Sequence, residues 1–100
     1  MAGKKSKKRV SQVCIVTVTG ADKVGIIARI ANTMAKANIN IIDVSQRIMA
    51  EYFVMTMAVD ITAATIDMEK IQAQLNKIAK GMDLNITLQH ENIFKMMHRV

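Results

Sequence analysis

The stretch that decides the fold runs from Val13 to Asn38 and reads VCIVTVTGADKVGIIARIANTMAKAN. Its first seven residues are mostly β-branched, which is typical of a strand that ends at Gly20. From Val24 onward the apolar residues recur at intervals of three and four, so the second half predicts an amphipathic helix that ends near Asn38. A short loop joins the two elements.

Two further strands are predicted after this helix, from Ile39 to Met49 and from Tyr52 to Ile61, with a hairpin turn at Ala50-Glu51 between them. Strand side chains alternate between the two faces of a sheet. Alternate residues of the second strand should therefore face the core, namely Phe53, Met55, Met57, Val59 and Ile61.

Helical spacing returns after residue 67, where Asp67 and Glu69 suit the positive end of a helix dipole and Gly81 suits a C-terminal cap. Residues 84–89 alternate again and predict a fourth, half-buried strand. The order β-α-β-β-α-β favours an α+β, ferredoxin-like sandwich, in which two helices cover one face of a four-stranded antiparallel sheet. An uncovered edge of such a sheet is commonly relieved by oligomerisation, so we expect at least a dimer.

A chain of 100 residues, 51% hydrophobic and 22% charged, is expected to form one domain. We place that domain at residues 11–90, a disordered basic arm at residues 1–10, and a short helix or tail at residues 91–100. Five of the 14 basic residues lie in the arm, so the net charge of +6 leaves the body of the chain nearly neutral. A solvated arm is the expected role, with RNA or anionic-lipid contact as alternatives, and the neutral body argues against a nucleic-acid-binding face.

The single cysteine, Cys14, lies in an apolar strand pattern, which predicts a buried thiol, no disulfide and a cytoplasmic location. No apolar stretch is long enough for a membrane span, and no signal-peptide pattern is present. His90 and His98 lack further ligands at metal-binding spacing, so we expect no metal and no cofactor. Asp43 and Asp60 could pair as general acid and base, although solvated carboxylates are the simpler interpretation. We therefore expect no enzyme.

The loop before the first helix is the one place suited to a ligand. Gly20 and Gly25 allow a close approach of the backbone, Asp22 could cap the helix, and the free amides of the first helical turn could receive a carboxylate.

This loop reads DKVGII at residues 22–27, and the chain reads ANINIID at residues 37–43. With these segments the chain resembles the ACT domain, a ferredoxin-like module that senses amino acids, over roughly residues 11 to 90. Residues 44–55 (VSQRIMAEYFVM) and 91–100 (ENIFKMMHRV) are similar to stand-alone single-ACT-domain proteins of bacteria and archaea.

The resemblance implies a regulatory homodimer that binds a small molecule, with an amino acid as the expected ligand, at a site shared between two subunits. Gly25 and Asn40 match the family's ligand-site positions, and Asp22 matches a loop position often held by Asn. The implied ligand-binding residues are Gly20, Ala21, Asp22, Lys23, Val24, Gly25, Ile26, Asn40 and Ile41. The alternative is a structural or protein-interaction module that binds no ligand and docks an unidentified protein partner.

Overall fold

The central strand β1 (Val13–Ala21) lies between β3 (Tyr52–Asp60) and β4 (Leu84–His90), and β2 (Asn40–Met49) pairs with the outer side of β3. All three pairings are antiparallel. The computed structural model describes residues 12–97, so the predicted arm at residues 1–10 and His98 lie outside the described residues. The strand order β2-β3-β1-β4 confirms the ferredoxin-like arrangement predicted from the sequence.

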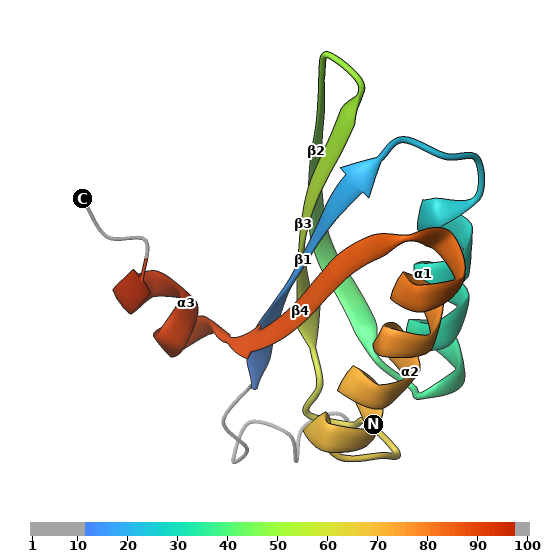
Figure 1. Ribbon diagram of the computed structural model, residues 1–100. Coiled ribbons are helices and arrows are strands. Elements are labelled where there is room, and N and C mark those ends of the chain that lie inside the picture. The colour runs from blue at the N-terminus through green and yellow to red at the C-terminus, as the bar shows by residue number, and fades with distance from the viewer. Residues whose placement is uncertain (1–11, 98–100) are drawn as a thin grey trace.

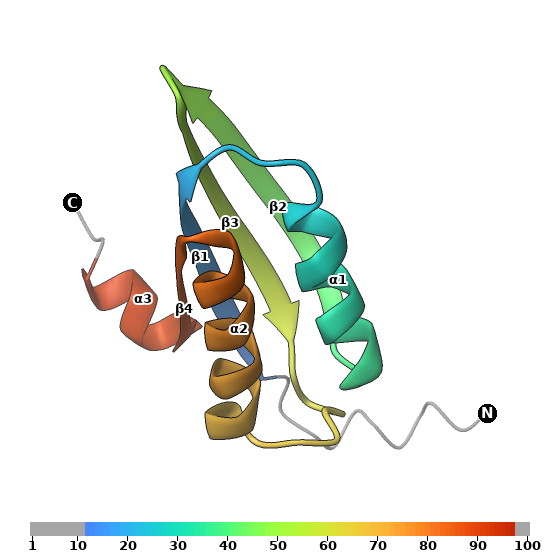
Figure 2. The same ribbon diagram turned by 45° about the vertical axis from the view of Figure 1, so that its right-hand side comes forward.

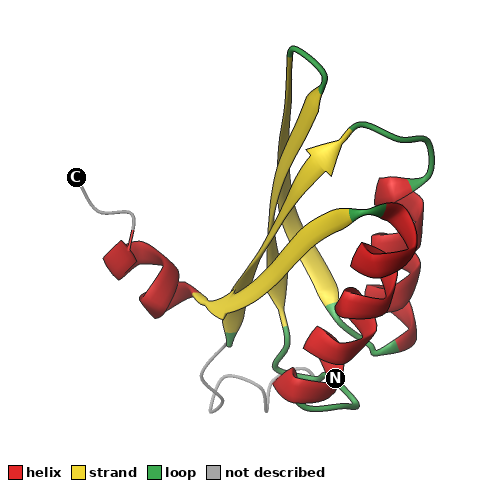
Figure 3. Cartoon of the chain, in the orientation of Figure 1, coloured by secondary structure: helices red, strands yellow, loops and turns green. Residues whose placement is uncertain are grey.

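Two helices, α1 (Ile26–Lys36) and α2 (Met68–Met82), lie side by side on one face of this sheet (Figures 1 and 2). Coloured by secondary structure, the strands form one layer with these helices on one side of it (Figure 3). Alternate strand residues meet the helices, which is why the side chains of Cys14, Val16 and Val18 in β1 are fully buried.

The core-facing positions predicted for β3 are confirmed with one exception. Phe53, Met55, Met57 and Val59 are buried, whereas Ile61 lies beyond the end of the strand and is only partly buried. From the helices, Ile30, Met34, Ile71 and Leu75 complete the core and are almost fully buried.

The helix ends differ from the prediction at two positions. Gly81 lies inside α2 rather than capping it, and the helix ends at Asp83, whose left-handed backbone (φ 55°) closes the last turn. Asp22 does not cap α1, because Gly25 is the N-cap residue with φ 93°. Asp67 does cap α2, where its Oδ1 accepts a 2.9 Å hydrogen bond from the amide of Lys70.

The two edge strands of the sheet are not equivalent. Along β4, the Gln72 side chain of α2 donates from Nε2 to the carbonyl of Ile86 (3.1 Å) and accepts from the amide of Leu88 (2.9 Å). One side-chain amide thereby takes the place that a neighbouring strand would occupy. The other edge, β2, carries a register shift between Ile41 and Asp43, and three of its apolar side chains are exposed, namely Ile42, Val44 and Ile48.

A third helix, α3 (Glu91–Met97), follows β4 directly and stands on the side of the sheet away from α1 and α2 (Figure 1). Within residues 12–97 there is no helix with the length and apolar character that crossing a bilayer requires.

Candidate functional site

The loop between β1 and α1 forms one wall of a cavity of about 420 Å³. The opposite wall comes from the β2–β3 hairpin, and the floor comes from the first turn of α1. The lining residues are Asp22, Lys23, Gly25, Ile26, Ile27, Ala28, Gln46 and Phe53. We refer to this cavity as the loop cavity. It combines apolar surface with two charged side chains and one amide, the mixture found in small-molecule sites.

Two contacts fix the loop in place. The amide of Asp22 donates to the carbonyl of Glu51 in the hairpin turn (3.4 Å), and the ammonium group of Lys23 donates to the carbonyl of Met82 at the end of α2. The loop is therefore held at both sides, by the hairpin and by the second helix. Lys23 also places its positive charge at the negative end of the α2 dipole.

Gly25 starts α1 as its N-cap residue. Its backbone is left-handed, and a β-carbon built on it would meet no atom within 4 Å. Among the described residues no side chain caps this helix, and its first turn contains no acidic residue. The first backbone amides of any α-helix have no hydrogen-bond acceptor within the helix. The first amides of α1 are therefore suited to bind an anion in the loop cavity.

The predicted site residues do not all meet in one place. Asp22, Lys23, Gly25 and Ile26 line the loop cavity, whereas Asn40 lines a different cavity of about 350 Å³ at the other end of α1. The eleven residues of α1 separate the two ends, which corresponds to about 16 Å at 1.5 Å per residue.

The remaining four predicted residues line neither of these two cavities. Gly20 belongs to β1, and a β-carbon there would lie 2.7 Å from Cδ2 of Leu84, so glycine is needed for close packing against β4. Ala21 pairs with Tyr52 as the last residue of the strand, and Ile41 packs at the margin of the core. Val24 is 99% exposed, with its side chain in solvent.

Sequence analysis missed the contribution of the hairpin to the loop cavity. Gln46 pairs with the buried Met55, so its side chain is on the helix-covered face of the sheet. The sequence did carry a signal for this residue, because Gln46 is polar at a position where the strand alternation predicts an apolar side chain. Phe53, Ile27 and Ala28 carried no such signal, because apolar residues at these positions equally fit a core.

The second cavity is lined by Ala35, Asn38, Ile39, Asn40, Asp60, Thr62 and Ala63. Its carboxylate is already engaged, because Oδ1 of Asp60 accepts from the hydroxyl (2.5 Å) and the amide (2.9 Å) of Thr62. These hydrogen bonds, the hydroxyl first, lower the pKa of Asp60 below its usual value. Oδ1 of Asp43 accepts a 3.0 Å hydrogen bond from the amide of Val44, so each of the two carboxylates has its own hydrogen-bond donor.

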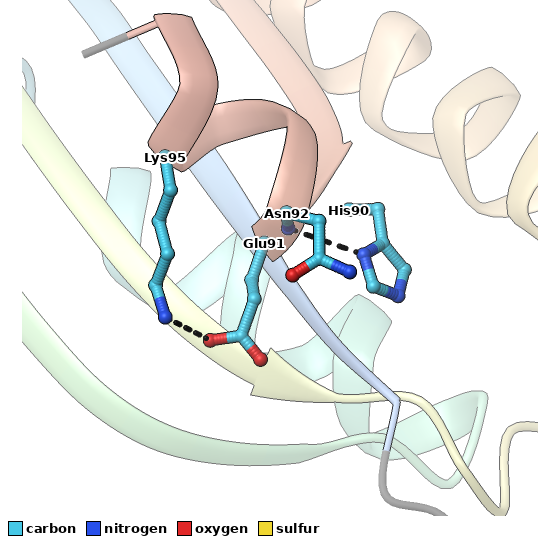
Figure 4. Close-up of polar contacts among 4 residues, drawn as sticks. All are labelled: His90, Glu91, Asn92 and Lys95. Atoms are coloured by element: carbon cyan, nitrogen blue, oxygen red, sulfur yellow. Dashed lines mark hydrogen bonds and ion pairs between the residues drawn. The ribbon is translucent and has the colours of Figure 1, made fainter. Parts of the chain in front are cut away.

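Cys14 is completely buried, and burial raises the pKa of its thiol, with a further increase from the charge of Glu91. These features favour a packing role over a nucleophilic one. The Nδ1 atom of His90 accepts a 3.2 Å hydrogen bond from the amide of Asn92, and Lys95 pairs with Glu91 at 3.4 Å, so this histidine helps to start α3 (Figure 4). No cluster of three or more potential metal ligands exists within the described part of the chain.

The ACT domain family matches over residues 12–89. A UPF0237 protein of Clostridium acetobutylicum is 43% identical over 86 residues, which cover 86% of this chain and 97% of that protein. Among solved structures, an ACT domain protein from Streptococcus pneumoniae superposes with a TM-score of 0.73 at 29% identity, covering 86% of this chain and 97% of the other.

A formyltetrahydrofolate deformylase from Pseudomonas syringae shares the fold with a TM-score of 0.75 at 17% identity, and the match covers 88% of this chain but 30% of the deformylase chain. The same fold thus occurs as one part of a larger protein. The match over most of the chain and the high identity to the clostridial protein show that this chain belongs to the ACT domain family.

Proposed function

We propose that this protein is a homodimeric regulatory module that binds an amino acid in the loop cavity. The observation that carries the proposal is the combination of this cavity with the uncapped, glycine-initiated start of α1. The first-turn amides would receive the ligand carboxylate. The carboxylate of Asp22 would then face the ligand ammonium group, while Ile27 and Phe53 offer apolar surface to a neutral side chain.

The separation of Gly25 and Asn40 supports a site built from two subunits. Within one chain these residues line different cavities, so they can serve one ligand only if Asn40 comes from the partner. The free edge of β2 offers a route to such a dimer, because the β4 edge is already occupied by Gln72.

The sequence of β2 is complementary to itself when two copies pair antiparallel about Ser45. Asp43 then lies opposite the partner subunit's Arg47, and Ile42 lies opposite the partner subunit's Ile48. Asp43 and Arg47 pair with Ala58 and Val54 of β3, so both lie on the face away from the helices and can meet across the interface. Charge and apolar complementarity thus favour the same register.

In this register the partner subunit's Asn40 would also lie near the loop that carries Asp22 and Gly25. The register brings the partner subunit's Asn40 opposite Ala50 or a neighbouring residue, given the bulge at the start of β2. The next residue, Glu51, receives the amide of Asp22. The partner subunit's Asn40 would therefore approach the loop end that carries Asp22 and Gly25.

The first experiment is a thermal-shift screen of the purified full-length protein against the twenty amino acids, because a ligand that binds only the folded state raises the melting temperature. We expect a shift for one amino acid or a chemically similar group of them. No shift with any amino acid at millimolar concentration would contradict the proposal and favour a module that docks a protein partner.

The second experiment tests the shared site by mixing two variants: Gly25→Leu, which should abolish ligand binding, and Asn40→Ala, which should weaken it by roughly 1 kcal/mol or a little more. In a heterodimer of Gly25→Leu and Asn40→Ala subunits, one of the two shared sites combines an intact loop with an intact Asn40. We expect the refolded mixture to recover ligand binding at about half the heterodimer's sites, measured by calorimetry. If each site lay within one chain, every site would carry one of the two changes and mixing would recover nothing. Gly25→Asn is the matched control, because Asn tolerates a left-handed backbone.

A further inference from the structure

The methionines of this chain fall into groups of very different exposure. Met34, Met55 and Met57 lie in the core and are 0% exposed. Met96 and Met97, in the last turn of α3, are 71% and 63% exposed. Among the methionine side chains that the structure describes, these two are therefore the most accessible to a solute in water.

Met97 differs from Met96 because its sulfur holds the end of α3 to the sheet. Nε2 of Gln89 in β4 donates a hydrogen bond to Sδ of Met97 (3.2 Å). At the start of the helix, the amide of Asn92 donates to Nδ1 of His90 (Figure 4). No residue of α3 is buried, and within the described chain the helix packs only on β1 and β4. With so little packing, hydrogen bonds to β4 count for more in fixing its position.

A methionine thioether is oxidised by a peroxide to a sulfoxide. A sulfur lone pair attacks one oxygen of hydrogen peroxide, and the O–O bond breaks. The second oxygen leaves with the bonding pair and takes up the proton of the transferred oxygen, which gives water. The sulfur is oxidised and the peroxide is reduced. The product is polar, and methionine sulfoxide reductases convert it back to methionine.

The added oxygen does not fit into the contact between Met97 and Gln89. An N–H···O hydrogen bond needs about 2.9 Å between nitrogen and oxygen. The whole distance from Nε2 of Gln89 to Sδ of Met97 is only 3.2 Å, so an oxygen bonded to Sδ on that side forces the sulfur away. If the oxygen points elsewhere, the sulfur carries a partial positive charge and no longer suits an N–H donor. In both cases Gln89 loses its sulfur acceptor.

We propose that Met97 is a reversible oxidation site, at which a peroxide converts the thioether to a sulfoxide and so releases the last turn of α3 from β4. Met96 is oxidised as readily, but among the described contacts its sulfur has no bond to the sheet to lose. The site is independent of the ligand proposed above, because no residue of α3 lines the loop cavity.

The first test is treatment of the full-length protein with hydrogen peroxide, followed by peptide mapping with mass spectrometry. We expect Met96 and Met97 to gain one oxygen atom each, about tenfold or more faster than Met34, Met55 and Met57. Methionine sulfoxide reductases A and B, one for each epimer, should then restore both residues. Equal rates of oxidation at Met97 and at the three core methionines would overturn the proposal.

Two variants separate the release of α3 from exposure alone, and both exchanges nearly conserve side-chain volume. In Met96→Leu, Met97 is the remaining methionine of α3. We expect peroxide to shift the side-chain amide NMR signals of Gln89 and to lower the backbone order parameters of residues 94–97.

Met97→Leu is the matched control, because Met96 is still oxidised but Gln89 has no sulfur partner to lose. Peroxide should leave the Gln89 signals and the order parameters of this variant unchanged. If oxidised Met96→Leu protein also kept both, Met97 would be exposed without holding α3, and the proposal would be wrong.

Discussion

The two faces of the sheet show how differently neighbouring residues of one strand can be constrained. On the helix-covered face, Val16 and Met57 are fully buried beneath α1 and α2. On the face away from these helices, their neighbours Thr17 and Thr56 are partly exposed and pair as small hydroxyl side chains. Packing under the helices therefore constrains the residues of the first face, whereas the residues of the second face are not constrained by the core.

The largest expected effect is the loss of a buried side chain. Met57→Ala should lower the free energy of unfolding by about 2–5 kcal/mol, because it leaves a cavity under the helices. Thr56→Ala, one residue away on the opposite face of the sheet, should cost about 1 kcal/mol or less. Urea unfolding at one protein concentration measures both, and equal losses would remove the distinction between the faces.

The second-largest effect on stability should come from Gly20, which lies close to Leu84. Gly20→Ala places a methyl group against Leu84 and should cost about 1–3 kcal/mol, as overpacking commonly does. Gly81→Ala is the matched control, since a β-carbon in this part of α2 meets nothing within 4 Å. That variant should stabilise the protein by about 0.5–1 kcal/mol. Thermal melts would show opposite shifts, and shifts of the same sign would contradict the assignment.

A third prediction concerns the Gln72 hydrogen bonds that connect α2 to the β4 edge of the sheet. Gln72→Ala should cost about 1–2 kcal/mol, because it removes the hydrogen bonds to Ile86 and Leu88. Gln74→Ala, on the same helix but exposed, should have almost no effect. Hydrogen exchange at the Leu88 amide should become faster in Gln72→Ala only. Unchanged exchange there would argue against a structural role for the Gln72 hydrogen bonds.

The smallest expected effect depends on pH and lies where β3 leaves the sheet. The lowered pKa of Asp60 stabilises the folded state above the unfolded-state pKa of about 3.9. This stabilisation is lost as the pH falls through the lower folded-state pKa. Thr62→Val removes the hydroxyl hydrogen bond, so the stability gap to the wild type should be present at pH 7 and narrow below about pH 4.

Titration of Asp60 by carbon-detected NMR would measure the same change directly, and we expect its pKa to rise in Thr62→Val. Thr65→Val is a control with no carboxylate partner among the described contacts. An unchanged Asp60 titration would show that the amide of Thr62 alone holds the carboxylate.

Periodicity alone predicted the fold because local patterns decide which face of each element is apolar. The alternation in residues 53–59 and the helical spacing in residues 26–36 both led to buried residues. Helix ends were less predictable. Asp22 has the chemistry of a cap, but the backbone turns at Gly25, and Gly81 has the freedom of a cap, but the chain turns at Asp83.

The candidate site was only partly accessible from the sequence. The loop residues are contiguous, so a short motif could identify them, and Asp22 to Ile26 do meet at one cavity apart from the exposed Val24. Gln46 lines the loop cavity from a strand that is distant in the sequence from the loop. Gln72 of α2 forms hydrogen bonds with β4. No local sequence pattern reports such contacts. In the proposed dimer, Gly25 would meet the partner subunit's Asn40, and no pattern within one sequence reports a contact between two copies.

The unequal edges of the sheet have a consequence for aggregation. A β-sheet with two free edges can add copies without limit, β2 to β4, and grow into a fibre. Gln72 engages one carbonyl and one amide of the β4 edge, which favours the β2 edge as the place where a second copy would join. Growth through strands would then stop at two chains. We expect the loss of this one glutamine to favour the addition of further copies at β4, and so filament formation, as well as to lower the stability modestly.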